Sequence, residues 1–191
     1  MIYKIIMLIL LFGFYLAYFA KQISLKKQGI YTNRLAKGNK PKQTQLIERF
    51  LIFVTYSIAM VQFLSVILSA DTGARALTII GICISAVGVV FFTLAITTMQ
   101  ENWRAGIDET QKTNIVSTGI YRFSRNPAFV GFDLLYIGTA LAFPNVFMIS
   151  FTALAVITLH LQILEEEKYL AKEFGEAYEV YKNKTARYLL F

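Results

Sequence analysis

The sequence contains a single cysteine and a single histidine, and it is poor in charge. Cys83 has no second cysteine with which to form a disulfide inside the chain. His160 alone excludes a zinc site of the multi-histidine kind, and we expect no metal ion. Charged residues make up 16% of the chain, against about 25% in soluble globular domains, which argues against a soluble fold.

Apolar side chains take the place of the missing charge. Of the 191 residues, 56% are hydrophobic and 15% aromatic, and the mean hydropathy is +0.53. This composition indicates an all-α, polytopic integral membrane protein that forms a single domain. We attribute the formal net charge of +7 to basic loops beside anionic lipid, and we expect the bilayer and no nucleic acid as a partner.

Five apolar runs are spaced along the chain as candidate membrane-spanning helices. The fourth run is short for a span, but Pro127 suits the first turn of a helix and Pro144-Asn145 suits a turn, so we expect an antiparallel helical hairpin over residues 127–164. The first run lacks a small-x-small cleavage site before Lys21, which favours a retained helix over a signal peptide. The predicted spans are residues 1–20, 50–70, 76–98, 127–143 and 146–164.

Lysine and arginine are distributed unevenly between the two sides of these spans. Of the nineteen, only Lys4 and Arg75 fall on one side and seventeen fall on the other. The loop at residues 21–45 carries basic residues and no acid. Because basic loops remain in the cytoplasm, we predict an outside N-terminus and a cytoplasmic active site and C-terminus. We divide the chain into N-terminal membrane helices (1–99) and a catalytic part (100–191).

Two further patterns predict how the helices pack. Gly81 and Gly88 in the third span would let a neighbouring helix approach closely. After the last span, Leu170, Phe174 and Tyr178 recur at helical spacing and give one apolar face. The tail therefore predicts an amphipathic helix on the cytoplasmic side.

The hairpin contains two ionisable residues at similar depth. Asp133 lies about 9 Å along the helix from Pro127, and His160 lies about 6 Å before Leu164. A charged acid facing lipid would cost a few kcal/mol, so we expect Asp133 to face a cavity or a partner. The residues alone leave open whether Asp133 bonds a neighbouring helix or serves a site, and whether His160 is an interfacial residue.

The stretch at residues 113–133 is where a polar segment with glycine and proline runs into an apolar helix. It contains Arg122, Arg125 and Asn126, and the acids Glu165–Glu167 follow where the last span leaves the membrane. Carboxylates, guanidiniums and a glycine-containing loop at one edge of the bilayer could bind a zwitterionic small molecule.

Two motifs in this region carry a resemblance to a known family. Residues 115–121, IVSTGIY, and 125–129, RNPAF, resemble the L-V-x-x-G-x-Y and R-H-P-x-Y signature of the isoprenylcysteine carboxyl methyltransferase family, which is related to the phospholipid methyltransferases. Residues 166–170, EEKYL, and 174–181, FGEAYEVY, resemble the family's E-E-x-x-L and F-G-x-x-Y-x-x-Y ending. The upstream pair Asn102-Trp103 adds to the match, which covers roughly residues 100–190.

The resemblance implies methyl transfer from S-adenosylmethionine to the carboxylate of a prenylated or lipid-like acceptor at the cytoplasmic face. It implies substrate contacts by Trp103 and Gln162 and catalytic roles for Arg125, Asn126, Asp133 and His160. The cofactor would be held by Thr113, Asn114, Ile115, Val116, Gly119, Tyr121, Asn126, Pro127, Ala128, Phe129, Glu166 and Glu167.

Three positions depart from the family pattern. Asn126 replaces a histidine, so it can donate and accept hydrogen bonds but cannot carry charge. Phe129 replaces a tyrosine and lacks its hydroxyl. Gln162 stands where the prenylcysteine enzymes place a substrate-binding arginine. These departures leave two alternatives open: a phospholipid amine N-methyltransferase, and a non-catalytic lipid-binding protein that keeps only the fold.

Overall fold

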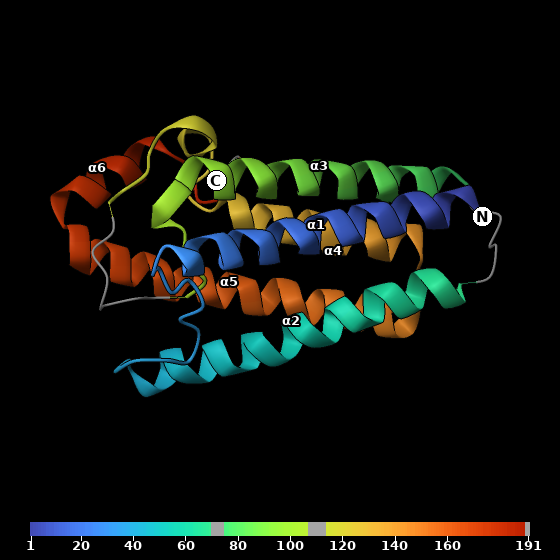
Figure 1. The fold of residues 1–191 in the computed structure, drawn as a ribbon, viewed down its shortest axis with the longest axis horizontal. Coiled ribbons are helices and arrows are strands. Elements are labelled where there is room, and N and C mark those ends of the chain that lie inside the picture. Colours follow the sequence, from blue (N-terminus) through green and yellow to red (C-terminus); the bar gives the residue numbers. More distant parts are fainter. Residues whose placement is uncertain (70–74, 107–113, 190–191) are drawn as a thin grey trace.

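The computed structural model describes residues 1–69, 75–106 and 114–189, and within these ranges the chain forms a bundle of six α-helices (Figure 1). An isolated bridge between Asn33 and Ala105 is the extent of strand-like pairing in these ranges, so the predicted all-α fold is confirmed. The helices are α1 (Ile2–Lys27), α2 (Lys42–Leu68), α3 (Arg75–Met99), α4 (Pro127–Ala142), α5 (Val146–Phe174) and α6 (Glu176–Lys184), with short 3-10 turns at Gln100–Asn102 (η1) and Gly119–Arg122 (η2).

The long helices α1, α2, α3 and α5 are each long and apolar enough to cross a membrane. Helix α4 is shorter, and its 16 residues extend about 24 Å, less than the roughly 30 Å of a bilayer core. It begins with Pro127 in its first turn, and Asn145 caps the start of α5 by accepting a bond from the amide of Met148. The predicted hairpin of α4 and α5 is thus present, with Pro127 at its predicted start and the Asn145 cap at its predicted turn.

The helices extend further than the apolar runs predicted. Helix α1 continues to Lys27 because lysine and glutamine are good helix formers and Gly29 is the first residue there that breaks a helix. Helix α5 likewise continues to Phe174, so Leu170 and Phe174 belong to it rather than to a separate tail helix. The break falls at Gly175, whose φ of 53° suits glycine, and the shorter α6 follows.

Helices α3 and α4 approach closely through glycines on both sides. A Cβ atom on Gly88 would lie 2.8 Å from the carbonyl oxygen of Gly131, and a Cβ atom on Gly131 would lie 2.8 Å from the Cβ atom of Phe92. Two turns away, a Cβ atom on Gly81 would meet the carbonyl oxygen of Gly138. The predicted close packing at Gly81 and Gly88 is confirmed, and it depends on matching glycines in α4.

Buried polar bonds add specific links between the helices. The hydroxyl of Tyr15 in α1 donates to Gln62 in α2 at 2.6 Å, and the amide of Gln62 donates to the hydroxyl of Thr139 in α4 at 3.1 Å. Both Gln62 and Thr139 are fully buried. Because an unpaired polar group would be costly in hydrocarbon, this chain of bonds fixes how α1, α2 and α4 are placed relative to one another.

We expect Gly131→Ala to destabilise the protein, because the added methyl group would overlap Phe92 unless α3 and α4 move apart. Such overpacking costs about 1–3 kcal/mol, which outweighs the gain in helix propensity. Thermal unfolding of the purified protein in detergent measures the effect as a lower midpoint. The matched control is Gly13→Ala in α1, where a Cβ atom would meet nothing within 4 Å and the midpoint should stay level or rise. Equal midpoints for the two variants would contradict the close contact.

Candidate active site

A cavity lined by both apolar and polar side chains lies at the end of the bundle that carries α6 and the C-terminal tail. Its volume is about 150 Å³, below the roughly 300–1,000 Å³ of typical ligand pockets, so a ligand of nucleoside size requires it to widen. The lining comes from two regions of the sequence. The first region supplies Met99, Asn102, Trp103, Arg104, Gly106, Asn114, Ile115, Val116, Tyr121, Arg125, Asn126, Ala128 and Phe129, and the second supplies Glu166, Tyr169, Leu170, Phe174, Tyr178 and Tyr181.

Most of the residues expected to bind the cofactor or the substrate lie in this lining. They are Trp103, Asn114, Ile115, Val116, Tyr121, Arg125, Asn126, Ala128, Phe129 and Glu166. Thr113 lies outside the described residues. The cavity lining does not include Gly119, Pro127, Asp133, His160, Gln162 or Glu167, although several of these contact residues that do line it.

Local geometry explains why the two halves of the first motif meet at the cavity. Gly119 has a φ of 57°, and a Cβ atom there would lie 3.0 Å from the side chain of Thr98 in α3. Glycine therefore lets the chain turn tightly against the end of α3. Pro127 then starts α4 directly after Asn126, which places residues 125–129 along the cavity wall.

Glu166 is the one carboxylate among the described lining residues. It accepts a hydrogen bond from the amide nitrogen of Gln162 at 3.0 Å, and no ion pair joins it to any other residue in the described ranges. The second acceptor of that amide is Glu48, at 3.5 Å. The cavity therefore presents a partly buried carboxylate whose charge is balanced by no contacting cation.

The basic loop after α1 forms the support behind Glu166. Glu48 is fully buried. Its carboxylate oxygens accept hydrogen bonds from the ammonium group of Lys40 at 2.7 and 2.8 Å and from the backbone N–H of Ala36 at 2.7 Å. The same loop pairs with the chain beside the cavity, where the N–H of Arg34 donates to the carbonyl of Ala105 at 2.9 Å. The sequence predicted this loop only as a topology signal, because no spacing within it indicates that it folds against the site.

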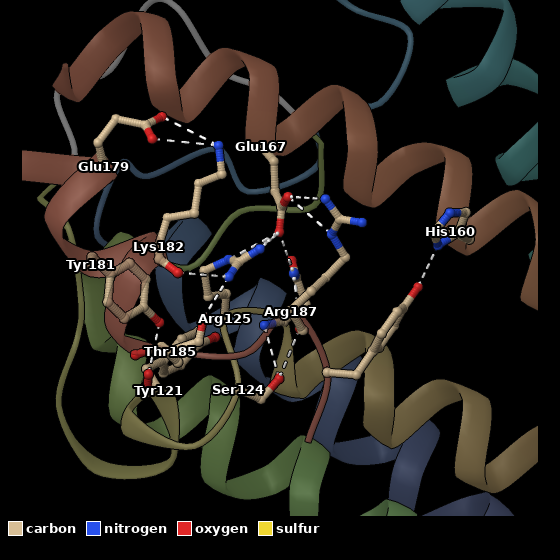
Figure 2. A network of polar contacts seen from close by, with 12 residues as sticks. Tyr121, Ser124, Arg125, His160, Glu167, Glu179, Tyr181, Lys182, Thr185 and Arg187 are labelled. Atoms are coloured by element: carbon tan, nitrogen blue, oxygen red, sulfur yellow. Dashed lines mark hydrogen bonds and ion pairs between the residues drawn. The ribbon is translucent and has the colours of Figure 1, made fainter. Parts of the chain in front are cut away.

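Glu167 is neutralised by two guanidinium groups (Figure 2). Its Oε1 atom accepts from Arg125 at 2.9 and 3.1 Å, and its Oε2 atom accepts from Arg187 at 2.8 and 3.0 Å. The Asn126 amide also donates to Oε1 at 3.2 Å. Contact with Glu167 raises the pKa of the Arg187 guanidinium, which stays charged throughout the accessible pH range. The two adjacent acids, Glu166 and Glu167, therefore have different roles.

The tail after α6 folds back over the start of α4 through these same residues. Besides binding Glu167, the Arg125 guanidinium donates to the carbonyls of Lys182 and Thr185, so its donors are largely used within the protein. The carbonyl of Arg187 accepts from Ser124 and Asn126, each at 3.2 Å. The arginine and asparagine of the motif line the cavity and also hold the tail in place.

Three tyrosines supply hydroxyl groups around the cavity. Tyr181 donates to the carbonyl of Tyr121 at 2.7 Å, as Figure 2 shows. The hydroxyl of Tyr178 is buried and has no hydrogen-bond partner among the described residues. Burial raises the pKa of Tyr178 to about 12, with a further contribution from Glu167. Burial also raises the pKa of Tyr121 and Tyr181, so all three stay protonated at neutral pH.

Asp133 and His160 lie beside the tail, away from the cavity lining. His160 shares a 2.6 Å hydrogen bond with the hydroxyl of Tyr188, which belongs to the tail. The Oδ1 atom of Asp133 is buried without a hydrogen-bond partner in the described ranges. Burial raises the pKa of Tyr188, and the charge of Asp133 adds to this effect, so the three groups form one cluster.

The sequence did not predict that α6 and the end of α5 supply a wall of the cavity beside Glu166. Tyr178 was expected on the apolar face of a tail helix, and both Tyr178 and Tyr181 belong to the second motif, but neither was assigned to the site. The second motif also contains Glu166, so it was the signal that could have placed them. Asn102 was likewise noted only beside Trp103; here its side chain accepts a bond from the amide of Asn114 at 2.9 Å.

The fold and the site define a polytopic membrane protein with a pocket that contains one carboxylate among its described lining residues, at one end of the helix bundle. The model of the family described as phospholipid methyltransferase matches residues 76–177, more than half of the chain. The chain therefore belongs to the phospholipid methyltransferase family, and the resemblance predicted from the motifs is confirmed.

Two curated relatives were found, and both are named protein-S-isoprenylcysteine O-methyltransferase. The protein of Saccharomyces cerevisiae is 31% identical over 122 residues, which cover 62% of this chain and 51% of the relative. That of Schizosaccharomyces pombe is 35% identical over 71 residues, which cover 37% of this chain and 30% of the relative. The chain thus spans about half or less of the length of the relatives that it matches.

We expect Glu167→Ala to release the tail, because it leaves the guanidiniums of Arg125 and Arg187 without their shared acid. Breaking a buried ion pair costs about 3–5 kcal/mol, and the partial exposure of Arg187 favours the lower end. Limited proteolysis would detect earlier cleavage after α6, and the midpoint of thermal unfolding would fall. In the control Glu179→Ala, the pair with Lys182 is about half exposed and its loss costs at most about 1 kcal/mol. A tail equally protected in both variants would mean that Glu167 does not hold it.

Proposed function

We propose that this chain is an S-adenosylmethionine-dependent methyltransferase that acts on the carboxylate of a prenylated or lipid-like acceptor. The single observation that carries the proposal is the state of Glu166 in the cavity of a phospholipid methyltransferase family member. Its carboxylate lines the cavity and has one neutral amide as its hydrogen-bond partner among the described residues. A buried acid of this kind favours a cationic ligand.

The cavity has groups that complement each charged part of this cofactor. Glu166 offers a negative charge to its sulfonium or ammonium group, and the unbonded hydroxyl of Tyr178 offers a donor to its carboxylate. Trp103, Phe129 and Phe174 offer apolar and aromatic surface for a nucleoside base. When bound, the cofactor supplies an activated methyl group.

The chain's own residues contribute mainly by holding this pocket rigid. Arg125 and Asn126 bond Glu167 and the tail, and Lys40 with Glu48 supports the side chain of Gln162, which bonds Glu166. A methyl transfer to a carboxylate is an in-line displacement on a nucleophile that is already charged. Positioning and exclusion of water then provide most of the reduction in barrier.

The cavity and the similar proteins together favour a carboxylate acceptor. The described lining contains the arginines Arg104 and Arg125, and Glu166 is the one acid in it that could take a proton from an amine. Asp133 and His160 lie outside that lining. Both relatives are named protein-S-isoprenylcysteine O-methyltransferase, which favours O-methylation of an isoprenylated cysteine. We place this site at the cytoplasmic face because seventeen of the nineteen basic residues were assigned to that side.

A second candidate is methylation of an amine on a phospholipid, which the description of the matching family favours. In that reaction Glu166, or the cluster of Asp133 and His160, would have to accept a proton. The third possibility, a lipid-binding protein without activity, requires that the pocket binds no cofactor.

We expect Glu166→Gln to weaken the binding of S-adenosylmethionine by about 1.5–3 kcal/mol, the usual range for a hydrogen bond to a charged group. Isothermal titration of the full chain in detergent measures this, with S-adenosylhomocysteine as a second ligand. The latter lacks the sulfonium charge, so its affinity should fall less. Glu173→Gln, an exposed acid on the same helix, is the control and should bind as the unaltered chain does. Unchanged affinity in Glu166→Gln would contradict the assignment of Glu166 to cofactor binding.

The pH dependence of turnover separates the two acceptors. A carboxylate is ionised above about pH 4, so kcat/KM with a prenylated cysteine should vary little between pH 6 and 8. An amine with a pKa of about 10 must lose a proton, so kcat/KM with phosphatidylethanolamine would rise about tenfold per pH unit. Initial rates with each acceptor provide the measurement. Turnover of phosphatidylethanolamine alone, with this slope, would overturn the carboxylate proposal in favour of the second candidate.

A further inference from the structure

A second, much larger cavity lies at the other end of the bundle, where the chain begins. Its volume is about 970 Å³, and it lies between α1, α2, the start of α3 and the turn from α4 to α5. Its wall is mostly apolar, with Met60, Leu64, Leu68, Phe147 and Phe151 among the lining residues. Nothing in the proposed methyl transfer uses this cavity.

The charged side chains among the described residues that line this cavity are cationic, and they belong to the starts of α1 and α3. Lys4 and Arg75 line it, and no acid does so among the described residues. These are the same two basic residues that the charge distribution places apart from the other seventeen. Among the described lining residues, these two cations create a local positive field beside the apolar wall of the cavity.

Both cations have donors available for a ligand. Lys4 donates to the carbonyls of Ile67 and Ser69 at 3.1 and 2.6 Å, which uses two of the three hydrogens of its ammonium group. Arg75 is exposed and forms no hydrogen bond or ion pair with the described residues. A phosphate between them would therefore meet the ammonium group of Lys4 and the guanidinium group of Arg75.

The length of the cavity matches one leaflet of a bilayer. Along α2 its lining runs from Ser57 to Ser69, about 18 Å at the rise of an α-helix. Half of a bilayer core is about 15 Å thick. The cationic end lies at the ends of the helices, where head groups would be, and the apolar part extends inward from there.

We propose that this cavity binds an anionic phospholipid of the bilayer, with one acyl chain in the apolar part and the phosphate between Lys4 and Arg75. A neutral lipid would use the apolar wall but gain little from the two cations. A water-soluble anion would use the cations but leave the apolar wall uncovered. An anionic phospholipid satisfies both, and it is a lipid held by the protein rather than the methyl acceptor.

The test compares two lipids that differ in head-group charge alone. The full chain is purified in detergent and titrated with phosphatidylglycerol or phosphatidylcholine of identical chains, and native mass spectrometry counts the bound lipids. We expect phosphatidylglycerol to bind more tightly. Lys4→Gln and Arg75→Gln should each weaken it about fivefold, the usual contribution of one basic residue near an anionic lipid. The paired control, Lys26→Gln with Lys27→Gln, removes two exposed cations from the other end of α1 and should change nothing.

A second variant tests the apolar part. Ser57→Phe projects a large side chain into the inner end of the cavity and should weaken both lipids while Lys4 and Arg75 remain. Its thermal unfolding midpoint shows whether the variant is folded, and Val61→Phe, which fills the same region, replaces it if it is not. Equal affinity for the two lipids, or equal losses in the lysine control, would overturn the proposal. So would a dimer that Ser57→Phe dissociates, because a second copy would then occupy the cavity.

Discussion

The close contact between α3 and α4 is the constraint on which the candidate site depends. The segment that carries the first motif connects these two helices, so its ends are fixed by how the helices pack. Glycines at Gly81 and Gly88, opposite Gly138 and Gly131, bring the two backbones into direct contact. In a membrane, where apolar side chains gain nothing by leaving lipid, such contact is a main source of helix association. A larger residue at these positions would move the start of α4 and the residues that follow Asn126.

The pocket end shows how a membrane protein can bury several acids and leave one for a ligand. Glu48 is paired with Lys40, and Glu167 is paired with two arginines, so these acids serve to join segments. Glu166 differs because its contact is an uncharged amide. Removing either partner of a buried pair leaves a costly unpaired charge. A cationic ligand at Glu166 would instead give a buried charge its partner. The hydrogen-bond and ion-pair partners of the three acids thus distinguish Glu48 and Glu167, which join segments, from Glu166, which is available to a ligand.

The sequence predicted the parts of this arrangement that local patterns encode. Hydropathy predicted the helices, Pro127 and Pro144-Asn145 predicted the hairpin ends, and the motif residues predicted most of the cavity lining. What it could not predict are contacts between distant segments. Nothing near Gln162 indicates that its amide meets Glu48, which lies 114 residues away in the sequence, because that contact depends on how α5 packs against α2.

The same limit explains why the predicted ends of the helices differ from those in the structure. The first span was predicted to end just before Lys21, but hydropathy marks where the membrane ends and not where the helix does. Likewise, the motif placed Glu166 and Glu167 together, yet adjacent residues on a helix point in directions about 100° apart. Glu166 therefore faces the cavity, and Glu167 faces the tail.

The chemistry proposed for the pocket explains why such rigid support suffices. A carboxylate acceptor needs no proton removed, so the transfer step itself needs no general base. The tyrosines stay neutral because burial raises their pKa, and the arginine beside them stays charged because Glu167 stabilises it. A pocket of this kind gains its specificity from shape and from the placement of one unpaired acid. The departure at Asn126 fits this view, because an amide can hold Glu167 and the tail without carrying a charge of its own.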